Sequence, residues 1–358
     1  MPHRIALLRN LLVRERLDGM IVTNLTNIRY LCGFTGSNGM MLVTRTGAAF
    51  YTDFRYQEQI KTEVHGCEKR VLERDLYAKF PIEDLNRLVG KRKWRRVGIE
   101  EDHLTLSRFR LLRSQLKNVQ LVPVLDLVLE LRRRKSPQEI ARMRKAQVIT
   151  EKVLTEVLKM LKPGVREKDL ALEIEFRFRR FGESAFPPIV ASGENGAKPH
   201  ARASDRRIRN GDCITFDIGC RYQGYCSDMT RTVFLGRPDQ ELKRAYESVL
   251  AAQEEALAVL RPGVPCKLID LAARDYLNRA GLGKFFGHSL GHGVGLDVHE
   301  QPALARTSKQ TLEPGDVVTV EPGVYLPGKG GVRIEDMVLI TRIGFSNLTK
   351  AKKEITIL

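Results

Sequence analysis

The first third of the chain alternates between short apolar runs and amphipathic stretches. Ile5, Leu8 and Leu12 recur at helical spacing, which predicts a helix over residues 5–16. Apolar runs predict strands at 20–22, 40–44, 48–52, 95–99 and 119–124, and amphipathic stretches predict helices at 56–64, 106–116 and 125–131. Helices interleaved with strands are typical of a compact α/β domain.

A strong helix start follows at residues 136–139, where the sequence is Ser-Pro-Gln-Glu. The serine suits the N-cap, the proline suits the first turn, and the glutamate can close a capping box. The Lys-Pro-Gly sequence at 162–164 predicts where this helix ends. We therefore assign residues 1–131 to an N-terminal domain and residues 132–358 to a second domain.

The second domain repeats itself weakly, in three segments that return in the same order. The paired segments are 161–165 with 260–264, 210–217 with 314–321, and 228–229 with 335–337. Two copies are too few for a solenoid, which needs three or more. The repeat predicts two halves related by a pseudo-twofold axis, each a helix pair followed by an antiparallel hairpin.

Composition adds a few exclusions. The chain has 358 residues, of which 42% are hydrophobic and 29% charged, as in ordinary globular proteins. Since eighteen uncharged apolar residues never run consecutively, we expect no membrane partner. Arg9 interrupts the first apolar segment, and the six cysteines form no CxxC pair. We therefore expect a cytoplasmic protein with free thiols.

The net charge of +17 raises the question of a nucleic-acid partner. The basic residues are dispersed, however, and the densest runs, at 91–93 and 132–135, are short. We find neither a known reading module nor aromatic residues interleaved with the basic runs. The pattern favours a solvated basic surface, and we expect no nucleic acid as partner.

The repeat places carboxylates at equivalent positions. Asp217 and Glu321 each end an apolar strand, and Asp228 and Glu335 fall in the second strand of each hairpin. For any one acid, a turn residue is the ordinary interpretation. Four converging near one axis would repel each other strongly unless cations neutralised them. Together with His292, the set suits two divalent ions bridged by shared carboxylates.

Five segments resemble the pita-bread metallopeptidases. They are 216–219, 227–232, 287–300, 320–325 and 332–336. Within that family they resemble the proline-specific branch, the Xaa-Pro aminopeptidases (aminopeptidase P) and Xaa-Pro dipeptidases (prolidases). The resemblance implies an α/β creatinase-like N-terminal domain and an α+β pita-bread catalytic domain with an internal pseudo-twofold duplication.

The resemblance also implies roles for individual residues. The metal ligands would be Asp217, Asp228, His292, Glu321 and Glu335, with Asp228 and Glu335 bridging both ions. The catalytic residues would be His200 and His299, which hold the carbonyl and shuttle protons, and Glu321, which carries a proton to the leaving nitrogen. The substrate-binding residues would be Phe186, His288, Tyr325 and Arg333.

The implied cofactors are two divalent ions, with manganese expected first and cobalt or zinc as alternatives. The implied partners are proline-containing peptides and a second copy of the chain in a homodimer. Our main hypothesis is hydrolysis of the N-terminal Xaa-Pro bond in the manner of aminopeptidase P, because segments 33–39 and 52–56 resemble its short bacterial type.

Three alternatives remain. A prolidase shares the same ligand set, so the sequence does not separate it from aminopeptidase P. A non-catalytic pita-bread binding module is disfavoured because all five ligand positions are filled. Methionine aminopeptidase is disfavoured because it typically lacks the N-terminal domain.

Overall fold

The computed structural model describes residues 2–358 with the exception of 74–75, 77–93, 117 and 126. The chain divides into two compact units, Met1–Arg132 and Arg133–Leu358. The division into residues 1–131 and 132–358 drawn from the sequence lies one residue away. None of the described helices has the length and hydropathy that crossing a membrane requires.

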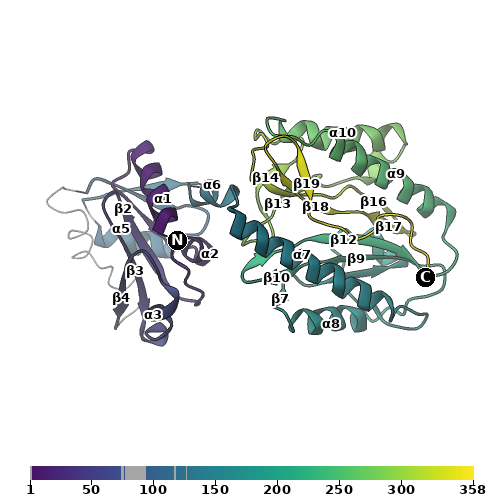
Figure 1. Cartoon of the computed structure of the whole chain (residues 1–358), viewed down its shortest axis with the longest axis horizontal. Coiled ribbons are helices and arrows are strands. Elements are labelled where there is room, and N and C mark those ends of the chain that lie inside the picture. The colour runs from purple at the N-terminus through teal and green to yellow at the C-terminus, as the bar shows by residue number, and fades with distance from the viewer. Residues whose placement is uncertain (1, 74–75, 77–93, 117, 126) are drawn as a thin grey trace. The chain divides into compact units, whose positions relative to one another are not determined.

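The first unit is built on a mixed six-stranded sheet in the order β4-β3-β2-β1-β5-β6 (Figure 1). The strands are β1 Gly19–Val22, β2 Met40–Thr44, β3 Ala48–Asp53, β4 Glu68–Leu72, β5 Arg96–Glu100 and β6 Gln120–Val124. The helices are α1 Pro2–Arg14, α2 Leu25–Cys32, α3 Gln59–Glu63, α5 Leu106–Gln115 and α6 Leu127–Arg133. Strand β1 runs antiparallel to β2 and parallel to β5.

The predicted apolar face of α1 is buried, since Ile5, Leu8 and Leu12 are at most 4% exposed. Two elements, α2 and β4, were not predicted. The predicted helix at 56–64 was wrong in its first part, where the chain forms a short 3-10 turn, Phe54–Tyr56, before α3.

In the second unit, two helix pairs enclose the strands (Figure 1). The helices are α7 Pro137–Leu158, α8 Glu167–Phe178, α9 Gln240–Ala258 and α10 Cys266–Arg279. The strands of the first half are β7 Glu183–Ser184, β8 Ile189–Ser192, β9 Cys213–Ile218, β10 Cys220–Tyr222, β11 Tyr225–Cys226 and β12 Met229–Phe234. Those of the second half are β13 Gly291–Gly293, β14 Glu300–Leu304, β15 Val317–Val320, β16 Gly323–Leu326, β17 Gly330–Arg333, β18 Asp336–Ile340 and β19 Phe345–Asn347.

The internal repeat is visible in the backbone itself. Gly164 and Gly263 both adopt positive φ, 92° and 85°, which a residue with a Cβ rarely adopts. Their N–H groups donate to equivalent carbonyls, those of Ile208 and Leu312, at 2.8 and 2.9 Å. Antiparallel pairs β9–β12 and β15–β18 form the matching hairpins. The predicted duplication is therefore confirmed.

The capping box at the start of α7 forms as predicted. The Ser136 side chain accepts from the Glu139 N–H, and the Glu139 side chain accepts from the Ser136 N–H at 2.8 Å. The second oxygen of Glu139 accepts from the Tyr225 hydroxyl at 2.7 Å, which connects this helix start to β11. The helix ends at Leu158, slightly before the predicted Lys-Pro-Gly stop.

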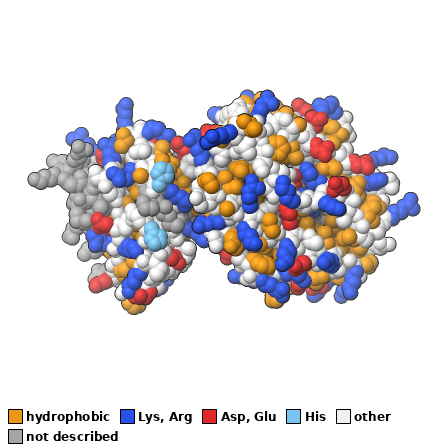
Figure 2. All heavy atoms as spheres, viewed as in Figure 1, with side chains coloured by type: hydrophobic (Ala, Val, Ile, Leu, Met, Phe, Trp, Pro, Cys, Tyr) orange, Lys and Arg blue, Asp and Glu red, His pale blue; other side chains and the backbone are white. Residues whose placement is uncertain are grey.

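Basic side chains are scattered over the face shown in Figure 2, interspersed with acidic and apolar groups. Several basic side chains of the described residues form local ion pairs, such as that of Arg166 with Asp169 at 2.7 Å. The large positive charge is therefore spread over this face as the sequence suggested.

Candidate metal centre and active site

The duplicated hairpins present the four carboxylates. Asp217 lies next to the last residue of β9, and Glu321 follows the last residue of β15. Asp228 and Glu335 each stand directly before a strand, β12 and β18, whereas the sequence placed them within it. Each half therefore offers one acid where the first strand ends and another where the second begins.

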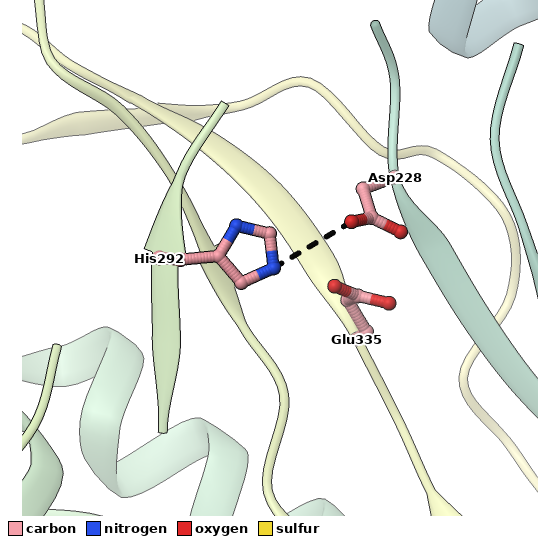
Figure 3. Close-up of side chains that lie close together, drawn as sticks. All are labelled: Asp228, His292 and Glu335. Atoms are coloured by element: carbon pink, nitrogen blue, oxygen red, sulfur yellow. Dashed lines mark ion pairs between the residues drawn. The ribbon is translucent and has the colours of Figure 1, made fainter. Parts of the chain in front are cut away.

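Asp228, His292 and Glu335 form a compact cluster (Figure 3). Each offers one donor atom, and these atoms all lie within 4.8 Å of one another. The Nε2 atom of His292, on β13, lies 3.6 Å from Asp228 Oδ2 and 3.3 Å from Glu321 Oε1. One imidazole among carboxylate oxygens is a donor set that suits a divalent cation.

Asp217 joins this group from β9. Its Oδ2 accepts from Nη2 of Arg333, whereas its buried Oδ1 has no hydrogen-bond partner within the described residues. Buried polar atoms normally have partners, so an oxygen left without one points to a group that binds it. This oxygen and the donor chemistry fit divalent cations. The residues that could hold them are Asp217, Asp228, His292, Glu321 and Glu335.

Burial opposes the ionisation of so many acids together. It raises the pKa of Asp228 well above its ordinary value, and the charge of Asp217 adds to this effect. It also raises the pKa of Glu335. Burial alone would raise the pKa of Glu321 and lower that of His292, but their mutual hydrogen bond shifts these values to about 2 and about 9. A cation binding here therefore competes with protons.

Hydrogen bonds orient the ligands. Nδ1 of His292 is 3.0 Å from the carbonyl of the next residue, which leaves Nε2 to face the carboxylates. The Thr230 hydroxyl donates to Glu335 at 2.8 Å, and the Thr319 hydroxyl donates to Glu321 at 3.0 Å. Neither threonine was predicted from the sequence. Each lies two residues from a predicted ligand, a spacing that puts side chains on one face of a strand.

A chain of hydrogen bonds connects the cavity wall to the ligands. Arg333 contacts Asp217 through Nη2 and donates from Nη1 to the Tyr325 hydroxyl at 2.8 Å. That hydroxyl lies 2.9 Å from Nε2 of His288, whose Nδ1 faces the carbonyl of the next residue. With Nδ1 carrying the proton, Nε2 accepts from the tyrosine. Burial lowers the pKa of His288, which favours this neutral form.

One cavity of about 860 Å³ brings all the predicted site residues together. They are Phe186, His200, Asp217, Asp228, His288, His292, His299, Glu321, Tyr325, Arg333 and Glu335. His299 packs edge-on against His292, with ring centroids 4.3 Å apart. Phe186 forms part of the cavity wall. A Cβ on Gly219 would lie 2.7 Å from the Phe186 ring, so the glycine leaves room for this ring.

Comparison with known proteins finds a matching family model for each of the two units. The model for metallopeptidase family M24 matches residues 141–342, and that for the Creatinase/Prolidase N-terminal domain matches residues 4–134. The chain belongs to metallopeptidase family M24. It is a metal-dependent hydrolase, as the sequence predicted, and members of family M24 bind divalent metals.

Several proteins that match nearly the full length of this M24 metallopeptidase are named as Xaa-Pro peptidases. The Xaa-Pro dipeptidase of Pyrococcus horikoshii is 34% identical over 345 residues, 96% of this chain and 95% of that one. The structure of an Xaa-Pro dipeptidase from Bacillus anthracis matches with a TM-score of 0.94 at 38% identity, covering 99% of both chains. That of an X-Pro aminopeptidase from Thermotoga maritima matches with a TM-score of 0.87 at 36% identity, covering 96% and 98%. These matches confirm the predicted creatinase-like and pita-bread architecture.

Proposed function

We propose that this M24 metallopeptidase hydrolyses Xaa-Pro bonds in small peptides. It would do so with two divalent ions held by Asp217, Asp228, His292, Glu321 and Glu335. The observation that carries the proposal is that these five side chains share one cavity with two exposed histidines, His200 and His299. Neither imidazole has a hydrogen-bond partner among the described residues, so both are available to a substrate.

The protein's own groups then have distinct tasks. Divalent ions bound here supply Lewis acidity for the peptide carbonyl and lower the pKa of water. His200 and His299 would donate hydrogen bonds to the carbonyl oxygen, stabilise its negative charge as water attacks, and shuttle protons in the site. Glu321 accepts a proton from the attacking water and passes it to the leaving nitrogen.

The substrate's prolyl nitrogen carries no hydrogen, so recognition must rely on the shape of the ring. Phe186, His288 and Tyr325 offer an aromatic wall for it, and Arg333 holds the tyrosine in place. This wall would therefore select proline after the scissile bond.

The first candidate activity is that of an Xaa-Pro dipeptidase, which the relatives of that name support over the whole chain. Aminopeptidase P activity is the second candidate. It is supported by the X-Pro aminopeptidase structure and by a cavity of about 860 Å³, near the upper end of the usual range for ligand pockets. Such a cavity has room for residues beyond a dipeptide.

The test is to compare Ala-Pro with Ala-Pro-Gly-Gly after removal of metal and readdition of manganese, cobalt or zinc. A dipeptidase should show kcat/KM at least about tenfold higher for Ala-Pro, and aminopeptidase P should show the reverse. Asp228→Asn should abolish hydrolysis, while Asp275→Asn, at an exposed position on α10, should leave it unchanged. Full activity after verified metal removal, or no hydrolysis of either peptide by the reloaded protein, would refute the proposal.

Four further properties belong to the same proposal. We expect manganese as the working metal, testable by elemental analysis of protein purified without added metal. We expect a homodimer, testable by sedimentation equilibrium, and a cytoplasmic location, testable by cell fractionation. We expect the domain division at residues 131/132 to separate two units that unfold in distinct transitions, testable by differential scanning calorimetry.

A further inference from the structure

Lys135 and Glu300 form a buried ion pair, and Glu300 directly follows His299 in the sequence. Their side chains are 1% and 3% exposed, and Lys135 Nζ lies 3.1 Å from Glu300 Oε2. Charged groups this far from water are rarely kept unless they are paired, because desolvation costs several kcal/mol for each ion. The pair joins residues 165 positions apart in the sequence, so it fixes one segment of the second unit against another.

The glutamate closes a loop. Its other oxygen, Oε1, accepts from the Asp297 N–H at 3.1 Å. Gly295 has no Cβ, and one built there would lie 2.4 Å from Glu300 Oε2, so the carboxylate packs directly on the backbone. The carboxylate thus holds residues 295–300 in a closed turn.

This loop carries His299. The imidazole makes no hydrogen bond to any residue that the structure describes, and its ring contact is with His292. Its own side chain therefore does little to fix its position, and the backbone of the loop must do so. The same loop is tied to the cavity, because the Gly295 carbonyl accepts from the Cys226 N–H at 2.8 Å, two residues before Asp228.

A hydrogen bond and a neighbouring ion pair fix the backbone at Lys135. Its N–H donates to the carbonyl of Gly315 at 3.1 Å. The neighbouring Arg133 pairs with Asp316, a carboxylate buried in the same turn, at 2.7 Å. The ammonium is therefore presented to Glu300 from a fixed backbone.

We propose that Lys135 is a positioning residue that, through Glu300, holds the loop bearing His299 in its working place. The proposal rests on the proposed function, in which His299 acts on the substrate. Neither Lys135 nor Glu300 lines the cavity, so both would act through the histidine.

The test uses Lys135→Met alone and in a His299→Ala background. Lys243→Met is the matched control, because the Lys243 side chain on α9 is 43% exposed. Lys135→Met should keep its full metal content and lose about 10- to 100-fold in kcat, the usual effect of a supporting partner, with KM within about threefold. In the His299→Ala background, Lys135→Met should lower kcat by less than about threefold, because the imidazole that Lys135 positions is absent. Lys243→Met should match the wild type in both backgrounds.

A merely structural role predicts a different pattern. Lys135→Met would then lower kcat by the same factor with and without His299, and that result would overturn the proposal. If Lys135→Met does not fold, the variant carrying both Lys135→Met and Glu300→Gln removes both buried charges and takes its place in the same comparison.

A second readout does not depend on activity. With ¹⁵N-labelled histidine, the His299 signals, assigned by their loss in His299→Ala, should shift or broaden in Lys135→Met, while those of His65 and His103 in the first unit stay unchanged. Unaltered His299 signals would refute the positioning role. If the wild type cleaves no Xaa-Pro peptide, the proposed function fails, and these signals still decide whether Lys135 positions His299.

Discussion

Gln253 supports the segments that carry two of the proposed ligands, Glu321 and Glu335. Its replacement by methionine should lower both the stability of the protein and its affinity for metal. It is fully buried on α9. Its Nε2 donates to the carbonyls of Val320 and Ile334 at 2.9 and 3.2 Å, and its Oε1 accepts from Lys353 Nζ at 3.0 Å. Each of the two carbonyls belongs to the residue directly before a ligand.

The expected loss follows from these three bonds. Methionine has a similar size, so the change removes hydrogen bonds with little change of volume. Each bond to a carbonyl contributes roughly 1 kcal/mol, and the bond from the lysine ammonium roughly 1.5–2 kcal/mol. Burial of the more apolar methionine side chain offsets part of this loss. The free energy of unfolding should therefore fall by about 2–4 kcal/mol. Manganese affinity should fall by about 10- to 100-fold, as when other supporting partners of metal ligands are removed.

Urea unfolding followed by circular dichroism measures the first effect, and calorimetric titration with manganese measures the second. Gln240→Met is the matched control, since Gln240 is an exposed residue at the start of the same helix. The reasoning is refuted if Gln253→Met loses less than about 1 kcal/mol, if Gln240→Met loses as much, or if manganese affinity is unchanged.

Three other changes test separate parts of the structure. His299→Ala should keep its metal by elemental analysis while kcat falls by roughly 10²–10⁴, and loss of metal would contradict its assignment to proton transfer. Ser136→Ala removes the cap of α7 and should lower the free energy of unfolding by about 1 kcal/mol in urea; an unchanged value would contradict the role of the cap. Because burial lowers the pKa of His288 below 6.5, the unfolded chain takes up this proton first, so stability should fall as the pH drops below that value, less steeply in His288→Gln. Equal slopes in urea melts at several pH values would refute this.

Much of the fold could be predicted because its signals are local. Apolar runs and helical spacing identified strands and helices, and the Ser-Pro-Gln-Glu start of α7 is a complete capping signal. Helix α2 was missed because it is short, although Asn24 caps its start and Gly33 its end with φ 97°. Strand β4 was missed because it lies at the edge of the sheet and begins with three charged residues, at 68–70, before Val71.

Some residues of the candidate site could be proposed from the sequence, whereas others could not. The proposed ligands could be expected to lie together, because each lies in a distinct motif and the repeat relates the carboxylates. Gln253 and the pair of Lys135 with Glu300 could not be predicted. Their partners lie 67 to 165 positions away in the sequence, and no local pattern encodes such a contact. Only the folded chain brings these groups together.

The two halves of the second unit share the donor set unequally. The first supplies Asp217 and Asp228, and the second supplies His292, Glu321 and Glu335. A cation that bridges residues of both halves would bind only while the halves are docked, so it would hold the two halves together. At a free concentration one hundred times its Kd, such a cation stabilises the docked form by about 2.7 kcal/mol. Metal supply should therefore affect the lifetime of the protein as well as its rate, because metal-free molecules should open more often to proteases.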